Sequence, residues 1–389
     1  MKTHFHSLKK ALPFAFLFAS APAQSQVDES SLYISGYTEI YFAQDAENPS
    51  DEQRPNFITN HKVQKQLGLN LAYIKALYSN KRVRANIALM TGTYAQYNLA
   101  SESSVLRNIH EANVGFDFSP NQEKFRNNDS DKAPPKIWLD AGIFPSHIGF
   151  ERPEGHDCLS LTRSLLSENS PYYETGIRFS YQSANERMFL SALLLNGWQR
   201  IRQPNGSSYP AYGWQMLFSP VDNFKLNISG YVGNERRENE ESKWRGFLNL
   251  YGDLKLKVKE GLEKFRIQAG LDFGMQETEP DEGKWNIWYS PVCLFRYRFA
   301  KKLSATFRIE NYVDKGGIII NRSGFKSSGY SFNFDYMPSS NAMLRIELRK
   351  LETQETDISV PGLNLKSSHL FITCSAIVSF ASLNLSTKK

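Results

Sequence analysis

A set of charged residues could together select solutes inside an aqueous passage. Part of the set lies between Pro145 and Tyr173: Glu151, Arg152, Arg163 and Glu168. The rest lies on segments that alternate in polarity: Arg178, Arg308, Glu310, Arg345, Glu347 and Arg349. Opposed charges at a narrow point select by charge and dipole, because side-chain rings set pore selectivity. Two plainer interpretations stay open: the loop charges only anchor the loop, and the others form a generic polar surface.

Enzymatic chemistry has weaker support. His156, Asp157 and Cys158, together with Glu151, contain the residue types of a metal site or a nucleophile. Their spacing matches no known site, and Pro153-Glu154-Gly155 marks this stretch as a loop. The sequence therefore predicts no catalytic residue, no metal and no cofactor.

The elements that carry the charged residues are predicted to be strands. Leu344, Ile346 and Leu348 alternate with Arg345, Glu347 and Arg349, which is the period of two of a strand. The same pattern recurs from residue 31 to residue 380 and predicts about 16 strands, an even number as in bacterial outer-membrane barrels. Residues 82–98 are expected to form one strand, residues 119–135 an overlong turn, and residues 381–389 a C-terminal tail.

The connections between these strands alternate between short and long. Ser79-Asn80-Lys81 and Ser183-Ala184-Asn185 are tight turns, whereas Ala43–Val63 and Pro145–Tyr173 are long. Outer-membrane barrels have short periplasmic turns and longer outer loops. The link from Pro145 to Tyr173 far exceeds the roughly 2–5 residues of a hairpin loop. We expect it to be a third outer loop that folds into the lumen, with Asp157 capping a helix over 158–167.

Composition agrees with a barrel whose two faces differ. Mean hydropathy is −0.47, as in a soluble protein, yet aromatic residues make up 13% of the chain. A transmembrane barrel combines a lipid-facing side, a watery interior and aromatic girdles. At this strand number the interior is wide enough for a water channel, so the apolar faces must meet lipid.

The first residues carry an export signal. Lys2, Lys9 and Lys10 precede the apolar run Ala11–Ala19, and Ala21-Pro22-Ala23 fits a cleavage site, so residues 1–23 are predicted to be a signal peptide. A buried N-terminal helix is the alternative. Removing these three lysines lowers the net charge from +6 to about +3, which gives no argument for nucleic-acid binding. No later apolar run reaches the ~18 residues of a transmembrane helix.

Several short motifs occur in an order that resembles a known family. In sequence order they are Gly142–Glu151, Thr162-Arg163-Ser164, Asn169–Tyr172, Thr175–Arg178, Leu195–Gln199, Arg308–Asp314, Asp335–Pro338 and Arg345–Glu347. Together they resemble the OmpL-like β-barrel porins of Gram-negative bacteria and, more distantly, the substrate-selective porins. The resemblance implies a porin of the outer membrane, and it names no solute.

The sequence as a whole predicts an all-β transmembrane antiparallel barrel that lets small hydrophilic solutes diffuse passively. The expected partners are outer-membrane lipid, small solutes or ions, and a possible homotrimer. The arginine-rich wall favours anions. Two alternatives remain: a barrel plugged by its loops that serves a structural, ligand-binding or adhesin role, and an outer-membrane enzyme.

Overall fold

The computed structural model describes residues 30–47, 49, 52–120, 134–203, 210–235, 243–257, 263–279, 283–356 and 364–387. The predicted signal peptide and most of the predicted turn over 119–135 lie outside these ranges.

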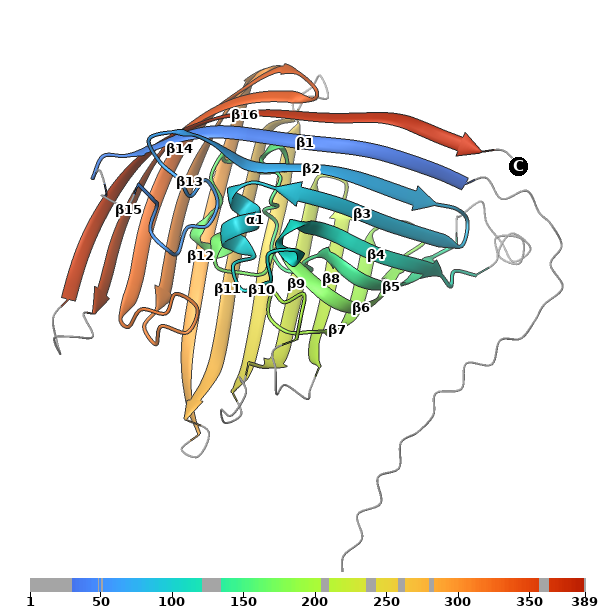
Figure 1. Ribbon diagram of the computed structural model, residues 1–389, viewed down its shortest axis with the longest axis horizontal. Helices are drawn as coiled ribbons and strands as arrows, with labels where there is room; N and C mark the ends of the chain where they lie inside the picture. Colours follow the sequence, from blue (N-terminus) through green and yellow to red (C-terminus); the bar gives the residue numbers. More distant parts are fainter. Residues whose placement is uncertain are drawn as a thin grey trace, which may run out of the picture.

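The described strands close into one antiparallel barrel (Figure 1). Their bounds are β1 Ser30–Asp45, β2 Leu67–Ser79, β3 Val83–Thr91, β4 Ile109–Asp117, β5 Lys136–Pro145, β6 Tyr173–Gln182, β7 Met188–Leu195, β8 Ala211–Val221, β9 Phe224–Asn234, β10 Trp244–Lys257, β11 Glu263–Glu279, β12 Lys284–Ala300, β13 Leu303–Asp314, β14 Phe325–Ser339, β15 Ala342–Thr356 and β16 Asn364–Thr387. Each strand pairs with its neighbours in the sequence, and β1 lies beside β16 at the seam. The predicted 16-stranded barrel is confirmed.

The seam extends further than the sequence suggested. β16 pairs with β1 from Phe371, opposite Asp45, to Thr387, opposite Ser30. Residues 381–387, which were predicted to be a tail, therefore belong to the last strand.

Side chains alternate between the two faces of the wall. On β14, Tyr330 and Phe332 are exposed on the outside, whereas Ser331 and Asn333 are buried on the inside. A soluble barrel would show the reverse, because its outer face meets water. An apolar outer face and a polar inner face suit a barrel surrounded by lipid.

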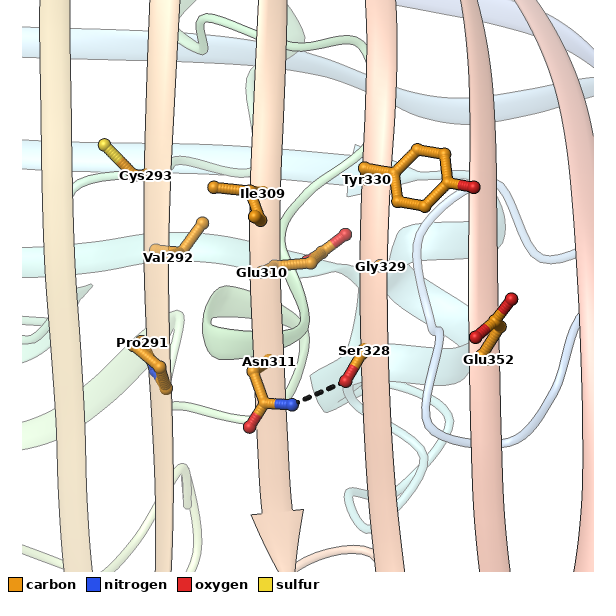
Figure 2. Close-up of a pocket in the computed structure, with 10 residues that line it drawn as sticks. All are labelled: Pro291, Val292, Cys293, Ile309, Glu310, Asn311, Ser328, Gly329, Tyr330 and Glu352. Atoms are coloured by element: carbon orange, nitrogen blue, oxygen red, sulfur yellow. Dashed lines mark hydrogen bonds between the residues drawn. The ribbon is translucent and has the colours of Figure 1, made fainter.

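The outer face carries a shallow groove over β12 to β15. Pro291 lacks an N–H group, and the pairing of β12 with β13 skips from Tyr289 to Val292. Beside it, Asn311 Nδ2 donates to Ser328 Oγ at 2.7 Å (Figure 2). The groove measures ≈ 440 Å³, and Figure 2 shows the residues that line it on β12 to β15.

Helices in the described chain are short: α1 Thr93–Asn98, η1 Leu106–Asn108, η2 Gly155–Asp157 and α3 Leu165–Glu168. The strand predicted over 82–98 is wrong in its second half. It ends at Thr91, because Gly92 has a φ of 122° and turns the chain into α1. A side chain at Gly92 would lie 2.5 Å from the Asn70 carbonyl oxygen, so glycine is required there.

Within the described ranges, no helix has both the length and the apolar character needed to span a bilayer.

Loops and inner wall share an apolar core. Trp198, between β7 and β8, packs its ring edge-on against Phe247 of β10, with centroids 4.8 Å apart. Phe57, between β1 and β2, lies 5.0 Å from the ring of Phe325 on β14. Leu165 of α3 belongs to the same buried cluster. Segments that are distant in sequence are therefore joined to the inner face by apolar packing.

Candidate functional site: the inner face and the β5–β6 loop

The segment between β5 and β6, residues 146–172, bonds to acidic and amide side chains of the inner face. The Leu161 N–H donates to Asn333 Oδ1 at 3.0 Å, and the Thr162 N–H donates to Glu347 Oε2 at 2.6 Å. The Leu165 N–H donates to Glu310 Oε2 at 2.7 Å. This explains why the helix predicted over 158–167 with Asp157 as its cap is wrong. The backbone bonds to the wall, and within residues 158–167 an α-helical turn begins only with α3, whose cap is Ser164.

Arginines of the wall bond to the carbonyl groups of the same segment. Arg308 Nη1 donates to the Thr162 carbonyl at 2.6 Å. Arg345 donates to the carbonyls of Gly155 at 2.6 Å and Leu159 at 3.0 Å. An irregular segment cannot pair these groups internally, and unpaired buried carbonyls are costly. The wall therefore supplies the partners that a helix or strand would otherwise provide.

The same wall side chains form buried ion pairs. Arg308 lies 2.8 Å from Glu347 and 3.2 Å from Glu310, and Arg349 lies 2.8 Å from Glu310. All four side chains are at most 1% exposed. Arg345 makes a similar buried pair with Asp335 at 2.7 Å. We call these side chains of β13, β14 and β15, with the loop backbone they hold, the anchored side.

Two charged residues of the loop fix its own shape. Arg163 donates to the carbonyls of Arg152 at 2.6 Å, Leu161 at 2.5 Å and Pro153 at 2.8 Å. Glu151 accepts from both the N–H and the hydroxyl of Ser164. Both charged groups are buried, so each serves the fold of the loop.

Glu168 joins this loop to the one between β1 and β2. Its Oε2 accepts from the N–H and hydroxyl of Thr59, at 2.8 and 2.7 Å, and from both nitrogens of Asn60 at 3.2 Å. The carboxylate therefore fixes the two loops together.

A cavity of ≈ 550 Å³ lies across the loop from the anchored side. The strand residues that line it come from β2, β4–β8 and β10, and include Tyr73, Lys75, His110, Arg178, Phe189, Gln215, Leu217 and Tyr251. From the loop, Ser146, His147, Gly149, Arg152, Pro153, Glu154, Asp157 and Tyr172 face it. We call this cavity, together with the inner face of β2–β11 around it, the open side.

Arg178 on the open side shares a carboxylate with Arg84. Arg84 makes two bonds to Asp140, at 2.8 and 2.7 Å, and Arg178 makes a longer one of 3.2 Å. The guanidinium of Arg178 also stacks 4.7 Å above the ring of Phe144. Its position is thus fixed by the wall while one side remains accessible.

Lys75 and Glu154 were not among the predicted site residues. Lys75 Nζ lies 2.6 Å from Glu111 on β4, and Glu154 lies 3.0 Å from His110 Nε2. Burial raises the pKa of Glu154, but the hydrogen bond and charge of His110 outweigh it and lower the pKa to about 2. The Glu154 carboxylate is therefore ionised at neutral pH.

A bulge explains why sequence reasoning missed Lys75. Alternation alone placed Leu67, Leu69, Leu71 and Tyr73 on one face. The pairing of β2 with β1 shifts by one residue between Glu39 and Ile40. This bulge in β2 turns the side chain of Leu71 inward, and that of Tyr73 with it. Lys75 follows on the inner face. No residue pattern marks the bulge. Glu154 could have been found from the sequence, because it lies two residues after Arg152 in the same charged loop.

The described residues hold no group of three or more His, Cys, Asp or Glu side chains placed to bind a metal ion.

Comparison with known families identifies the class of barrel. A model of the family described as "Putative beta-barrel porin-2, OmpL-like" matches residues 31–380. The chain belongs to this family. The match covers nearly all of the described barrel, and it makes the protein a porin of the outer membrane, a class of channel for passive diffusion. Family and fold thus point to a channel without enzymatic activity.

Solved structures share the fold of this porin at low sequence identity. The outer-membrane channel DcaP of Acinetobacter baumannii is 13% identical, with a TM-score of 0.57 over 91% of this chain and 98% of that one. An anion-selective porin from Comamonas acidovorans is 10% identical, with a TM-score of 0.55 over 90% and 100%. The trimer form of OmpT from Vibrio cholerae is 9% identical, with a TM-score of 0.52 over 91% and 100%. No functionally curated protein matches the sequence.

The predicted site residues of the porin separate into two groups. Arg152 and Arg178 line the open cavity. The others are buried and lie away from its lining: Glu151, Arg163, Glu168, Arg308, Glu310, Arg345, Glu347 and Arg349. Their contacts match the plainer interpretation left open by the sequence, in which charges anchor the loop.

Proposed function

We propose that solutes cross this porin between the β5–β6 loop and the wall of the open side, and that the loop narrows the passage. The observation that carries the proposal is the uneven attachment of the loop, which also bonds to the other side through Glu154 to His110 and through the Gly149 N–H to Asn249. Its backbone bonds to β13–β15, and the accessible cavity borders β2, β4–β8 and β10.

The anchored side makes a stable boundary for such a passage. Moving the loop would leave Arg308, Glu347 and Arg345 buried without their loop partners. Their ion pairs within the wall would stay intact, but each lost hydrogen bond to a charged group costs roughly 1.5–3 kcal/mol. Thermal motion therefore leaves the loop in place, and solutes use the space on its other side.

Arg152 and Arg178 are the predicted residues that we assign to this passage. Arg152 comes from the loop and Arg178 from β6, and both border the same cavity. Rings of charged side chains set selectivity in pores. The remaining predicted residues position the loop.

A plugged barrel is the second candidate, and one observation favours it. Phe57, Leu165 and Trp198 pack with aromatic residues of the inner wall in a single buried core. Loops joined in this way could close the lumen, and the cavity would then serve to bind a ligand. Conductance separates the two candidates.

The test is single-channel recording of the refolded mature protein in a planar bilayer. Gln215 faces the cavity and Ser328 faces outward. In a background with Cys293→Ser and Cys374→Ser, we compare Gln215→Cys with the control Ser328→Cys. A charged thiol reagent should reduce the current through Gln215→Cys only. A folded barrel that never conducts, or equal block of both variants, contradicts the proposed passage.

We also propose that the porin assembles as a homotrimer. The trimer form of OmpT shares its fold, and an apolar outer wall offers room for contact between copies. The mass of the protein–detergent complex, measured by light scattering, tests this. A complex with a single protein chain contradicts it.

A further inference from the structure

We propose that the open side is a cationic surface that admits small anions, such as carboxylates and phosphates, in preference to cations. The inference rests on the proposed passage, since only a conducting lumen can select ions. The observation behind it is that, in the Arg and Lys ion pairs of the open side, the acid lies behind the base.

In the ion pairs that Arg84, Arg178 and Lys75 make on the strands of the open side, the base lies nearer to water than the acid. The Arg84 side chain is 30% exposed and its partner Asp140 is 1% exposed. Lys75 is 26% exposed and Glu111 is 7% exposed. The positive ends of these pairs therefore face the passage, and the negative ends lie against the wall.

A pair on β10 and β11 repeats the arrangement. Arg266 makes two bonds to Asp253, at 2.9 and 2.7 Å. The arginine is 21% exposed and the aspartate is 9% exposed. The layering is thus found at separate places around the inner face.

The open side also holds bases that are not balanced by an acid of their own. Arg84 and Arg178 share the single carboxylate of Asp140, which leaves one positive charge in excess. Among the described residues, no carboxylate lies within salt-bridge distance of Arg152. Its N–H donates to Cys158 Sγ at 3.2 Å and its carbonyl accepts from Arg163 at 2.6 Å. The backbone is held, and the exposed guanidinium borders the cavity.

Further bases follow on the same face. Lys255 shares the inner face of β10 with Asp253, and Lys225 shares that of β9 with Asn227, because side chains two apart lie on one face. In the described part of the chain, neither lysine lies within salt-bridge distance of a carboxylate. They add positive charge to the same wall.

The loop contributes opposing charges, and each of them meets a histidine. Glu154 lies 3.0 Å from His110, and Asp157 lies 2.9 Å from the ring of His156. Asp157 is the more exposed of the two acids. These acids reduce the positive field near the loop, while the bases of the facing wall and Arg152 are the groups that an entering anion meets.

The chemistry of the exposed groups suits oxyanions. A guanidinium presents a planar fork of donors that matches carboxylate and phosphate geometry, and such bonds are stronger than neutral ones. Arg152 offers such a fork from the loop, and Arg178, whose Nε and Nη2 face Asp140, presents its remaining donors from the other side of the same cavity. A cation would meet the positive groups of the wall, whose partner acids lie behind them, and Asp157 of the loop is the exposed acid that it could reach.

The experiment is the reversal potential of the refolded porin in a potassium chloride gradient. We expect chloride to be more permeant than potassium. The double variant Arg152→Gln/Lys255→Gln should lower the chloride-to-potassium permeability ratio by roughly twofold or more, since two positive charges that attract a passing anion are removed. The control Lys350→Gln removes a charge from the outer face and should leave the ratio unchanged.

The possible outcomes separate the two proposals. Stable conductance with potassium preference overturns the anion inference and leaves the passage intact. An unchanged ratio in the double variant, or an equal change in Lys350→Gln, also overturns it. A barrel that inserts and never conducts overturns the passage, and the anion inference with it.

Discussion

The anchored side and the open side of the lumen use the same residue types for opposite purposes. On the anchored side, Arg308 and Glu347 are shut off from water and hold the backbone of the β5–β6 loop. On the open side, Arg178 and Arg84 pair with Asp140 and remain partly exposed. Access of water, rather than the identity of the charge, separates a structural group from one that meets solutes.

The energetic consequences differ accordingly. A buried ion pair is held by its partners, and removing one of them leaves an uncompensated charge. A partly exposed pair is screened by water and contributes little to stability. Mutations on the anchored side should therefore change stability, and those on the open side should change conduction.

The largest effect is expected at Arg345. Its guanidinium bonds to Asp335 and to the loop carbonyls of Gly155 and Leu159. Arg345→Ala should lower the free energy of unfolding by about 3 to 5 kcal/mol, measured by urea unfolding in micelles. Current through single channels should also become noisier as the loop is released. Arg178→Ala is the matched control, with a change within about 1 kcal/mol. Equal losses of unfolding free energy in the two variants would contradict the distinction between the anchored side and the open side.

A smaller effect is expected where the two loops meet. Glu168→Ala removes the acceptor shared by Thr59 and Asn60, so it should cost about 1.5 to 3 kcal/mol, as for hydrogen bonds to a charged group. Asp157→Asn, at an exposed carboxylate of the same loop, should stay within about 0.5 kcal/mol. Urea unfolding of both variants measures the difference. Similar values for the two would show that Glu168 does not join the loops.

The smallest effect is a pH dependence at His147, a loop residue that borders the open cavity. Its Nδ1 lies 2.9 Å from Glu174 Oε2, and its Nε2 lies 2.9 Å from the Gly230 carbonyl. Burial lowers the pKa of His147, but the Glu174 carboxylate outweighs burial and raises the pKa above its usual value. The protonated ring can donate to both acceptors.

Because this pKa is raised on folding, the stabilisation is fully present below the unfolded pKa of about 6.5 and is lost as pH rises through the folded pKa. We expect the free energy of unfolding to fall over that range by on the order of 1 to 2 kcal/mol. Urea unfolding at a series of pH values measures the fall. Glu174→Gln removes the carboxylate and should flatten the dependence. A dependence that persists in this variant would assign it to another group.

The fold was predictable because alternation is a local property. Leu344, Ile346 and Leu348 face outward, as their spacing indicated. The bulge before Leu71 and the turn at Gly92 were not predictable, since each depends on the neighbouring strand. The site was predictable only as a set of inward charges. Whether Arg308 or Arg178 is exposed to water depends on where a loop distant in sequence lies. The spacing of residues within either strand does not predict the position of that loop.

The seam between β1 and β16 also constrains how the barrel is assembled. Ser30 and Thr387 become partners although most of the chain separates them. Contacts of such long sequence separation form slowly, because the chain between them must first be ordered. Until then both edges expose unpaired N–H and carbonyl groups, which are templates for pairing with another chain. An unfolded chain on its way to the membrane therefore needs a chaperone that covers both strand edges. The risk of aggregation ends only when the barrel closes.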